Sequence, residues 1–74
     1  MNFGKAFKEL REEKGLSRKD VAKQIGCTQS SLSKIERNKV QPKPATIDAF
    51  CVICVTPVAR FYNLAFEADD FEMR

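Results

Sequence analysis

Residues 18–37 carry apolar side chains at helical spacing on both sides of one glycine, and this pattern constrains the fold more than any other feature. The repeating apolar positions are Val21, Ile25, Leu32 and Ile35. Gly26 lies between the two segments, where a helix end needs a positive φ that a residue without Cβ adopts most easily. Ala22 is small enough to let two helices approach closely. The stretch therefore predicts two short helices joined by a tight turn.

The second of these helices also has a polar side. Its hydrogen-bonding and cationic side chains are Thr28, Gln29, Ser30, Ser33, Lys34 and Arg37. Such side chains suit the base edges and phosphates of nucleic acids. The polar side of this helix-turn-helix arrangement is therefore suited to contact with a nucleic acid.

The charge of the 74-residue chain is unevenly distributed. Residues 1–43 contain eleven Lys or Arg and five Asp or Glu, a net charge of +6, whereas residues 44–74 contain two and five, a net charge of −3. A basic first part fits a segment that binds a polyanion, and an acidic second part fits one that faces elsewhere. Ordinary solvated helix faces would give the same counts, so charge alone leaves both interpretations open.

The length leaves room for one small domain with a modest core. No apolar run approaches the roughly 20 residues that cross a bilayer. The start of the chain does not resemble a signal peptide, because charged residues interrupt its apolar positions. We therefore expect a cytoplasmic protein without a membrane partner.

The three cysteines, Cys27, Cys51 and Cys54, are an odd number in a chain without histidine. A disulfide framework is not expected, and three thiols without another ligand do not complete an ordinary zinc site. Cys51 and Cys54 lie in an apolar helical run, where buried cysteine behaves as a small hydrophobic residue. A redox or metal-binding role for this pair is the alternative.

Five helices and no strand are expected along the chain. Three of them cover Phe3–Lys14, Arg18–Ile25 and Gln29–Arg37, and the others open at Pro44 and Pro57. The residues that mark helix ends are the N-caps Ser17, Thr28 and Thr56 and the terminators Gly15 and Asn38.

The helix that opens at Pro44 is the most apolar of the five. Its core stripe is Ile47, Phe50, Cys51 and Cys54. Val52, Ile53 and Val55 are apolar as well, which predicts that this helix is buried on more than one side. A buried strand over Cys51–Val55 is an alternative, but it would have no partner strand.

Several short motifs follow one another along the chain. They are Leu10-Arg11, Gly15-Leu16-Ser17, Val21-Ala22, Ile25-Gly26, Leu32-Ser33, Ile35-Glu36-Arg37-Asn38 and Pro42. Together they resemble the phage repressor and Cro family of DNA-binding domains, also called the Xre family, over about Phe7 to Phe66. The resemblance implies a compact all-α, five-helix, lambda-repressor-like domain over residues 1–66, with its third helix in the major groove. It also implies a partly buried ion pair between Arg11 and Glu36.

The same resemblance assigns contacts with DNA. The residues that it places at base edges are Thr28, Gln29, Ser30, Ser33 and Lys34. The residues that it places at phosphates are Ser17, Arg18, Arg37, Asn38, Lys39 and Lys43. Gln29 is the strongest candidate, because an amide near the start of the helix could bond adenine N6 and N7. A solvated amide is the alternative at that position.

Two positions depart from the pattern of the family. Its fourth helix usually ends in glycine, whereas Cys54-Val55-Thr56-Pro57 contains none, so this helix must close differently. Lys43 stands at the N-cap of the fourth helix, where Ser or Thr is usual. Both departures bear on the geometry of the fourth and fifth helices.

The leading functional hypothesis is a sequence-specific transcriptional regulator, a repressor, that binds a pseudo-palindromic operator as a homodimer. One domain of this size reads only a few base pairs, so two copies are expected. The apolar residues expected at the dimer interface are Val58, Phe61, Tyr62, Leu64 and Phe66. The alternative for these residues is that they complete the core.

Residues 67–74 form an acidic tail, for which flexibility or binding of a protein partner is expected. The second hypothesis is the antitoxin of a toxin–antitoxin pair, which binds operator DNA and whose tail with Phe71 would fold on contact with a protein toxin. An enzyme is not indicated, because the chain has no histidine and no glycine-rich phosphate loop. No cofactor is expected.

Overall fold

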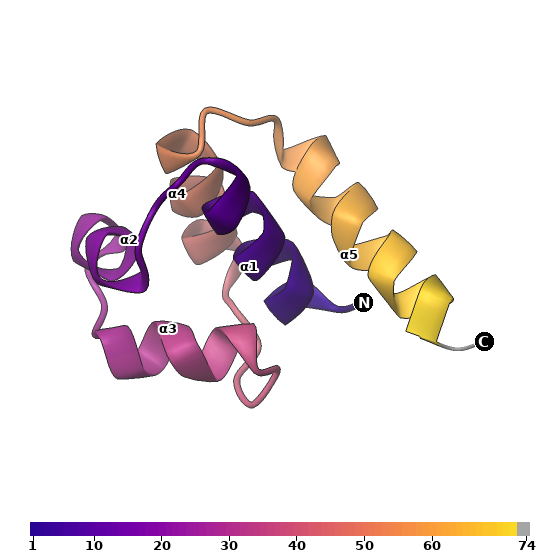
Figure 1. The fold of residues 1–74 in the computed structure, drawn as a ribbon, viewed down its shortest axis with the longest axis horizontal. Helices are drawn as coiled ribbons and strands as arrows, with labels where there is room; N and C mark the ends of the chain where they lie inside the picture. The colour runs from indigo at the N-terminus through magenta and orange to yellow at the C-terminus, as the bar shows by residue number, and fades with distance from the viewer. Residues whose placement is uncertain (73–74) are drawn as a thin grey trace.

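The structure, a computed structural model, describes the backbone of residues 1–72 and the side chains of residues 1–67. The elements of that part are α1 (Phe3–Glu13), α2 (Arg18–Ile25), α3 (Gln29–Glu36), α4 (Pro44–Ile53) and α5 (Val58–Glu72). Figure 1 shows α1 in the middle, with α3 below it, α2 and α4 on one side and α5 on the other. The predicted all-α fold of five helices is confirmed.

Short-range signals in the sequence set the ends of the first three helices. The hydroxyl oxygens of Ser17 and Thr28 accept backbone hydrogen bonds from three residues ahead, both at 3.1 Å, and so cap α2 and α3. Gly15 and Gly26 follow α1 and α2 with φ of 69° and 77°, a region that disfavours residues with a Cβ. α2 has the predicted bounds, whereas α1 and α3 each end one residue earlier than predicted.

Three phenylalanines from different helices form the centre of the core. Phe7 of α1 stacks on Phe50 of α4 with 4.2 Å between ring centroids, and Phe61 of α5 meets Phe7 edge-on at 5.3 Å. All three side chains are fully buried. The other buried apolar residues are Ala6, Leu10, Val21, Ala22, Leu32, Ile35, Ile47, Cys51, Cys54 and Ala65. This core joins α1, α4 and α5 to the helix pair α2–α3.

α4 is buried on one side only. Its predicted core stripe, from Ile47 to Cys54, is buried, but Val52 is 76% exposed and Val55, just after the helix, is 86% exposed. The prediction of burial on more than one side is therefore wrong. Apolar composition alone does not specify burial, since folded proteins expose much apolar surface. Only the stripe at helical spacing reports the packed face of this helix.

The end of α4 closes without glycine. Val55 adopts a φ of 49°, and its N–H donates to the carbonyl oxygen of Val52 at 3.1 Å. The N–H of Thr56 donates to the carbonyl oxygen of Cys51 at 3.0 Å, which completes a Schellman motif. A β-branched residue in the left-handed region costs free energy that glycine avoids. The missing glycine is thus replaced by a strained valine.

Val55→Gly is expected to raise the free energy of unfolding by about 1 kcal/mol, because it relieves the strain at positive φ. Chemical denaturation of the two proteins would measure the difference. Val52→Gly is the matched control, since this valine is also exposed but lies inside the helix. Glycine there should lower stability by about 0.5–1 kcal/mol. Equal effects of the two substitutions would contradict the strain at Val55.

α5 runs to Glu72, so its helical backbone continues into the segment predicted as an acidic tail. The side chain of Phe71 lies outside the described residues. Phe61 is 0% exposed, which corrects its assignment to a dimer interface, because its ring fills the core between α1 and α4.

Within the described residues no single helix is long and apolar enough to span a membrane. α4 and Val58–Glu67 together have the length and composition of a membrane span, but the pair is bent by 110°.

An ion pair ties the end of α1 to the start of α5. The two Nη groups of Arg60 donate to the two carboxylate oxygens of Glu13, both at 2.6 Å. Chiefly through this hydrogen bond, Arg60 lowers the pKa of Glu13. The pair therefore stabilises the fold above the ordinary glutamate pKa and loses its effect as pH falls through the lowered value. Both side chains are largely exposed, so its contribution is small.

Candidate nucleic-acid interface

α2 and α3 form a closely packed helix-turn-helix. Gly26 turns the chain, and the N–H of Cys27 donates to the carbonyl oxygen of Ala22 at 2.9 Å. Ala22 is 2% exposed where α2 meets its neighbours, and Leu32 and Ile35 bury the inner side of α3. The outer side of α3 therefore has a fixed orientation relative to the rest of the domain.

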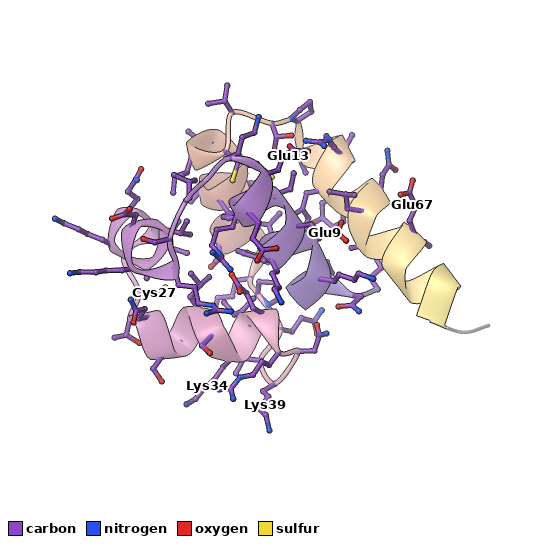
Figure 2. The ribbon with its side chains drawn as sticks, in the orientation of Figure 1. Glu9, Glu13, Cys27, Lys34, Lys39 and Glu67 are labelled. Carbon is purple, nitrogen blue, oxygen red and sulfur yellow. The ribbon has the colours of Figure 1, made fainter. Side chains whose placement is uncertain are left out.

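The outer side of α3 presents polar side chains to solvent. Gln29, Ser30 and Lys34 are exposed, and Ser33 is half-buried. Figure 2 shows Lys34 of α3 and Lys39 of the following loop pointing away from the body of the domain at the same edge. This surface offers amide, hydroxyl and ammonium groups, which are the groups that hydrogen-bond base edges.

Thr28 differs from the other predicted base contacts because its hydroxyl group caps α3. Its Oγ1 accepts from the N–H of Ser31 as the N-cap of α3, and its hydroxyl donates to Oγ of Ser31 at 3.0 Å. The polar atom of Thr28 is therefore engaged in starting the helix. Its methyl group can add to the exposed surface without breaking these bonds.

The buried carboxylate of Glu36, the last residue of α3, lies between two arginines. Nε of Arg11 donates to Oε2 of Glu36 at 2.8 Å, and Nη2 donates to Oε1 at 3.3 Å. Nε of Arg18 donates to Oε1 of Glu36 at 3.0 Å. The Glu36 side chain is 2% exposed and that of Arg11 is 9% exposed. The structure thus contains the pair that the resemblance implied and adds Arg18, so that α1, α2 and α3 meet at one charge.

Arg18 is the first predicted phosphate contact whose surroundings differ from expectation. Its side chain is 46% exposed, but its Nε is bonded to Glu36. Because a guanidinium carries five N–H donors, Arg18 can keep this bond and still offer its Nη groups to a phosphate. The carboxylate would then hold the arginine in place at the start of α2.

Asn38 is the second predicted phosphate contact with an unexpected role. It ends α3 with a φ of 59°, as predicted for a terminator. Its side-chain amide, however, is bonded to Asn2 and to the backbone of Gly4 at 2.7 and 2.9 Å. Oδ1 and one N–H of Nδ2 are engaged in these bonds, so Asn38 has a structural role. Its contact with a phosphate stays a prediction.

The other predicted phosphate contacts lie in two places beside α3. Ser17 is exposed and caps α2, while Arg37 caps the end of α3 with its Nε 3.4 Å from the carbonyl oxygen of Ser33. Lys39 and Lys43 are exposed in the loop between α3 and α4. Lys43 caps α4 without a side-chain hydrogen bond, as expected for lysine at that position. Hydrogen-bonding and cationic groups therefore lie at the start of α2 and in the segment that follows α3.

Sequence reasoning did not find Asn2 or Gly4. Asn2 is 7% exposed and caps α1, and Gly4 touches the end of α3. The N-cap preference of asparagine was a local signal for Asn2. The contact of Gly4 with α3 has no local signal, because it joins segments far apart in the chain.

Among the described residues, the three free cysteines belong to no group of His, Cys, Asp or Glu side chains that could hold a metal ion. Cys51 and Cys54 are buried in the core, and Cys27 is half-buried in the turn before α3. Burial raises the pKa of all three thiols. A thiol with a raised pKa forms little thiolate at neutral pH, so these cysteines do not resemble activated nucleophiles.

Comparison with known families shows which family of domains the chain belongs to. Residues 2–61 match the helix-turn-helix domain family, and the chain belongs to that family. The predicted likeness to repressor and Cro domains is thereby confirmed at the level of the family. The family consists of DNA-binding regulators, so a catalytic interpretation of this domain has no support.

The chain is also similar to individual transcriptional regulators and to one solved structure. The chain is 30% identical over 67 residues to the HTH-type transcriptional regulator PuuR of Escherichia coli (strain K12), and equally to PuuR of Shigella flexneri. This similarity covers 90% of the chain but 36% of each relative, so the chain spans about a third of their length. The crystal structure of the clp gene regulator ClgR from C. glutamicum matches with a TM-score of 0.86. It is 21% identical, and the match covers 90% of this chain and 87% of that one, which supports the fold.

Proposed function

We propose that this domain binds double-stranded DNA in a sequence-specific manner and acts as a cytoplasmic transcriptional repressor. One observation carries the proposal: α3 is packed through Leu32 and Ile35 and presents Gln29 and Lys34 on its exposed side. A helix about as wide as the major groove, fixed in orientation and polar outside, is suited to reading base edges. The two PuuR proteins are named as transcriptional regulators, which supports the same class.

Base readout is proposed for one part of α3. Gln29 stands in the first turn, where an amide can make two hydrogen bonds with adenine. Ser30 and Ser33 are short and would reach bases directly or through water. Lys34 would reach guanine or a phosphate. Thr28 would contribute a methyl contact, since its hydroxyl caps the helix.

Phosphate contacts are proposed on both sides of α3. Ser17, Arg18 and the N–H groups at the start of α2 would bind one strand, because a helix N-terminus favours anions. Arg37, Lys39 and Lys43 would bind phosphates near the end of α3. Such contacts fix the register of the domain without reading sequence.

A homodimer through α5 is part of the proposal. Val58, Tyr62 and Phe66 are spaced by four residues and therefore lie along one side of the helix. Phe66 is 62% exposed, Val58 is 37% exposed, and Tyr62 and Leu64 are half-buried beside the core. Apolar side chains in water along one helix favour pairing with the same surface of a second copy. Two-fold symmetry would match a pseudo-palindromic operator.

The test is selection of bound sequences from a random duplex library with the purified protein at moderate salt. The expected result is an enriched inverted repeat with half-site centres about one helical turn apart. Binding without enrichment would contradict sequence-specific readout. No binding to any duplex would overturn the proposal and favour a domain that binds a protein and not DNA. The antitoxin alternative predicts both an enriched operator and a protein partner for residues 67–74.

Gln29→Ala should weaken binding to the selected site by about 1–3 kcal/mol and relax the preference at one base pair. Lys39→Ala is the matched comparison, because it removes an exposed cation outside α3. It should weaken binding to all sequences alike and flatten the salt dependence by about one unit. Unchanged affinity and base preference after Gln29→Ala would show that α3 does not read the site as proposed.

A further inference from the structure

Two asparagine side chains join the start of α1 to the loop that follows α3. Nδ2 of Asn38 donates to Oδ1 of Asn2 at 2.7 Å, and Oδ1 of Asn38 accepts from the backbone N–H of Gly4 at 2.9 Å. Oδ1 of Asn2 also accepts from the N–H of Lys5 at 3.0 Å. We call Asn2, Gly4 and Asn38 the amide clamp.

The amide clamp is attached to closely packed parts of α1, α3 and α5. Asn2 is 7% exposed, and its backbone N–H donates to the carbonyl oxygen of Ala65 in α5 at 3.0 Å. Gly4 lies so close to α3 that a Cβ on it would be 2.7 Å from the carbonyl oxygen of Ile35. Three helices therefore converge at this point, and Asn38 is bonded to a part of the domain that cannot move freely.

The end of α3 does not need the Asn38 amide. Backbone hydrogen bonds close the helix. The N–H of Asn38 donates to the carbonyl oxygen of Ile35 at 3.0 Å, and the N–H of Lys39 donates to that of Lys34 at 2.9 Å. Glycine would adopt the same positive φ with less strain. The distinctive contribution of asparagine is its side chain, and both ends of that side chain bond the start of α1.

We propose that the amide clamp is a positioning device for Lys39, and this proposal rests on the DNA-binding function proposed above. The clamp holds the first residue of the loop against α1, and Lys39 follows directly. Lys39 then points to the same edge of the domain as Lys34, as Figure 2 shows. Holding its backbone lowers the entropy that contact with a phosphate would cost. Asn38 itself need not touch DNA.

A double-mutant cycle tests this coupling. Lys39→Ala should weaken binding to every duplex about threefold to tenfold and lower the salt slope by about one unit. Asn38→Gly keeps the helix end but removes the amide, and it should weaken binding about threefold. In the Lys39→Ala background, Asn38→Gly should have no further effect. Full additivity of the two substitutions would overturn the proposal.

Variants of Asn2 provide the matched control. Asn2→Asp keeps an oxygen that can accept from both Asn38 and Lys5, so its DNA affinity should remain close to that of the wild type. Asn2→Ser keeps an N-cap but is too short to reach Asn38, so it should reproduce the loss seen with Asn38→Gly. All affinities are measured well below the lowest Tm of the series. A wild-type affinity for Asn2→Ser would contradict the clamp.

A second measurement keeps the proposal separate from the proposed function. Backbone 15N relaxation of the free protein reports the order of residues 38–43 without DNA. Asn38→Gly and Asn2→Ser should lower the order parameter of Lys39, and Asn2→Asp should not. If the wild type binds no duplex, the proposed function fails. If the loop stays equally ordered in all variants, the amide clamp fails.

Discussion

Replacing Glu36 with glutamine is expected to lower the free energy of unfolding by about 3 kcal/mol, the largest effect of any single substitution proposed for this chain. The carboxylate is 2% exposed and accepts from both Arg11 and Arg18. Glutamine has nearly the same shape, but it leaves the guanidinium of Arg11 without a counter-charge in a place with little water. Urea denaturation monitored by circular dichroism would measure the loss.

Two further variants separate the buried charge from other causes. Arg18→Ala removes the exposed partner and should cost less than about 1 kcal/mol, because solvent screens that side of the pair. Replacing both buried partners, Arg11→Met with Glu36→Leu, should recover much of the stability lost in Glu36→Gln, since no charge is then left unpaired. If Glu36→Gln proved as stable as the wild type, the carboxylate would not be desolvated in solution.

The parts of the fold that were predicted correctly depend on local signals. Ser17 and Gly26 act on neighbouring backbone groups, and the stripe from Ile47 to Cys54 follows from helical spacing. Such features need no knowledge of which segments meet in space. The Arg11–Glu36 pair joins residues 25 apart, and only the resemblance to a family indicated it.

The errors have a common cause, which is that tertiary packing decided the outcome. Val52 and Phe61 are both apolar residues of predicted helices, yet one is exposed and the other is fully buried. The exposure of each depends on which side of its helix faces the core. In the same way, the bonds of the Asn38 amide with the start of α1 follow from packing and not from a local pattern.

The exposed surface of α3 was predicted better than the contacts that hold the helix in place. The polar side of α3 follows from its spacing, so the exposure of Gln29 and Lys34 could be predicted from the sequence. The residues that hold this helix in place were found only in part. The contacts of Asn38 with Gly4 and Asn2 span 34 and 36 residues, a separation at which no short pattern gives a signal.

Gly4→Ala is expected to destabilise the domain, although alanine normally favours a helix over glycine by about 0.5–1 kcal/mol. A Cβ at this position would clash with the carbonyl oxygen of Glu36 and lie 2.7 Å from that of Ile35. Both are backbone atoms of a packed helix, so α1 and α3 would have to separate. Forced overpacking of this kind costs about 1–3 kcal/mol, and a loss of 2 kcal/mol would lower the Tm by roughly 8–16 °C.

Glu9→Ala is the matched control for this substitution, because Glu9 is exposed on the same helix and its change leaves the contact with α3 intact. Its Tm should stay within about 2–4 °C of the wild type, as for most surface substitutions. The separation of α1 from α3 should also lengthen the bond from the Gly4 N–H to Asn38, so this amide should exchange with solvent faster in Gly4→Ala. A Tm above that of the wild type would mean that the start of α1 does not touch the end of α3. The amide clamp would then be contradicted as well, because Asn38 can bond Asn2 and Gly4 only where α1 and α3 approach closely.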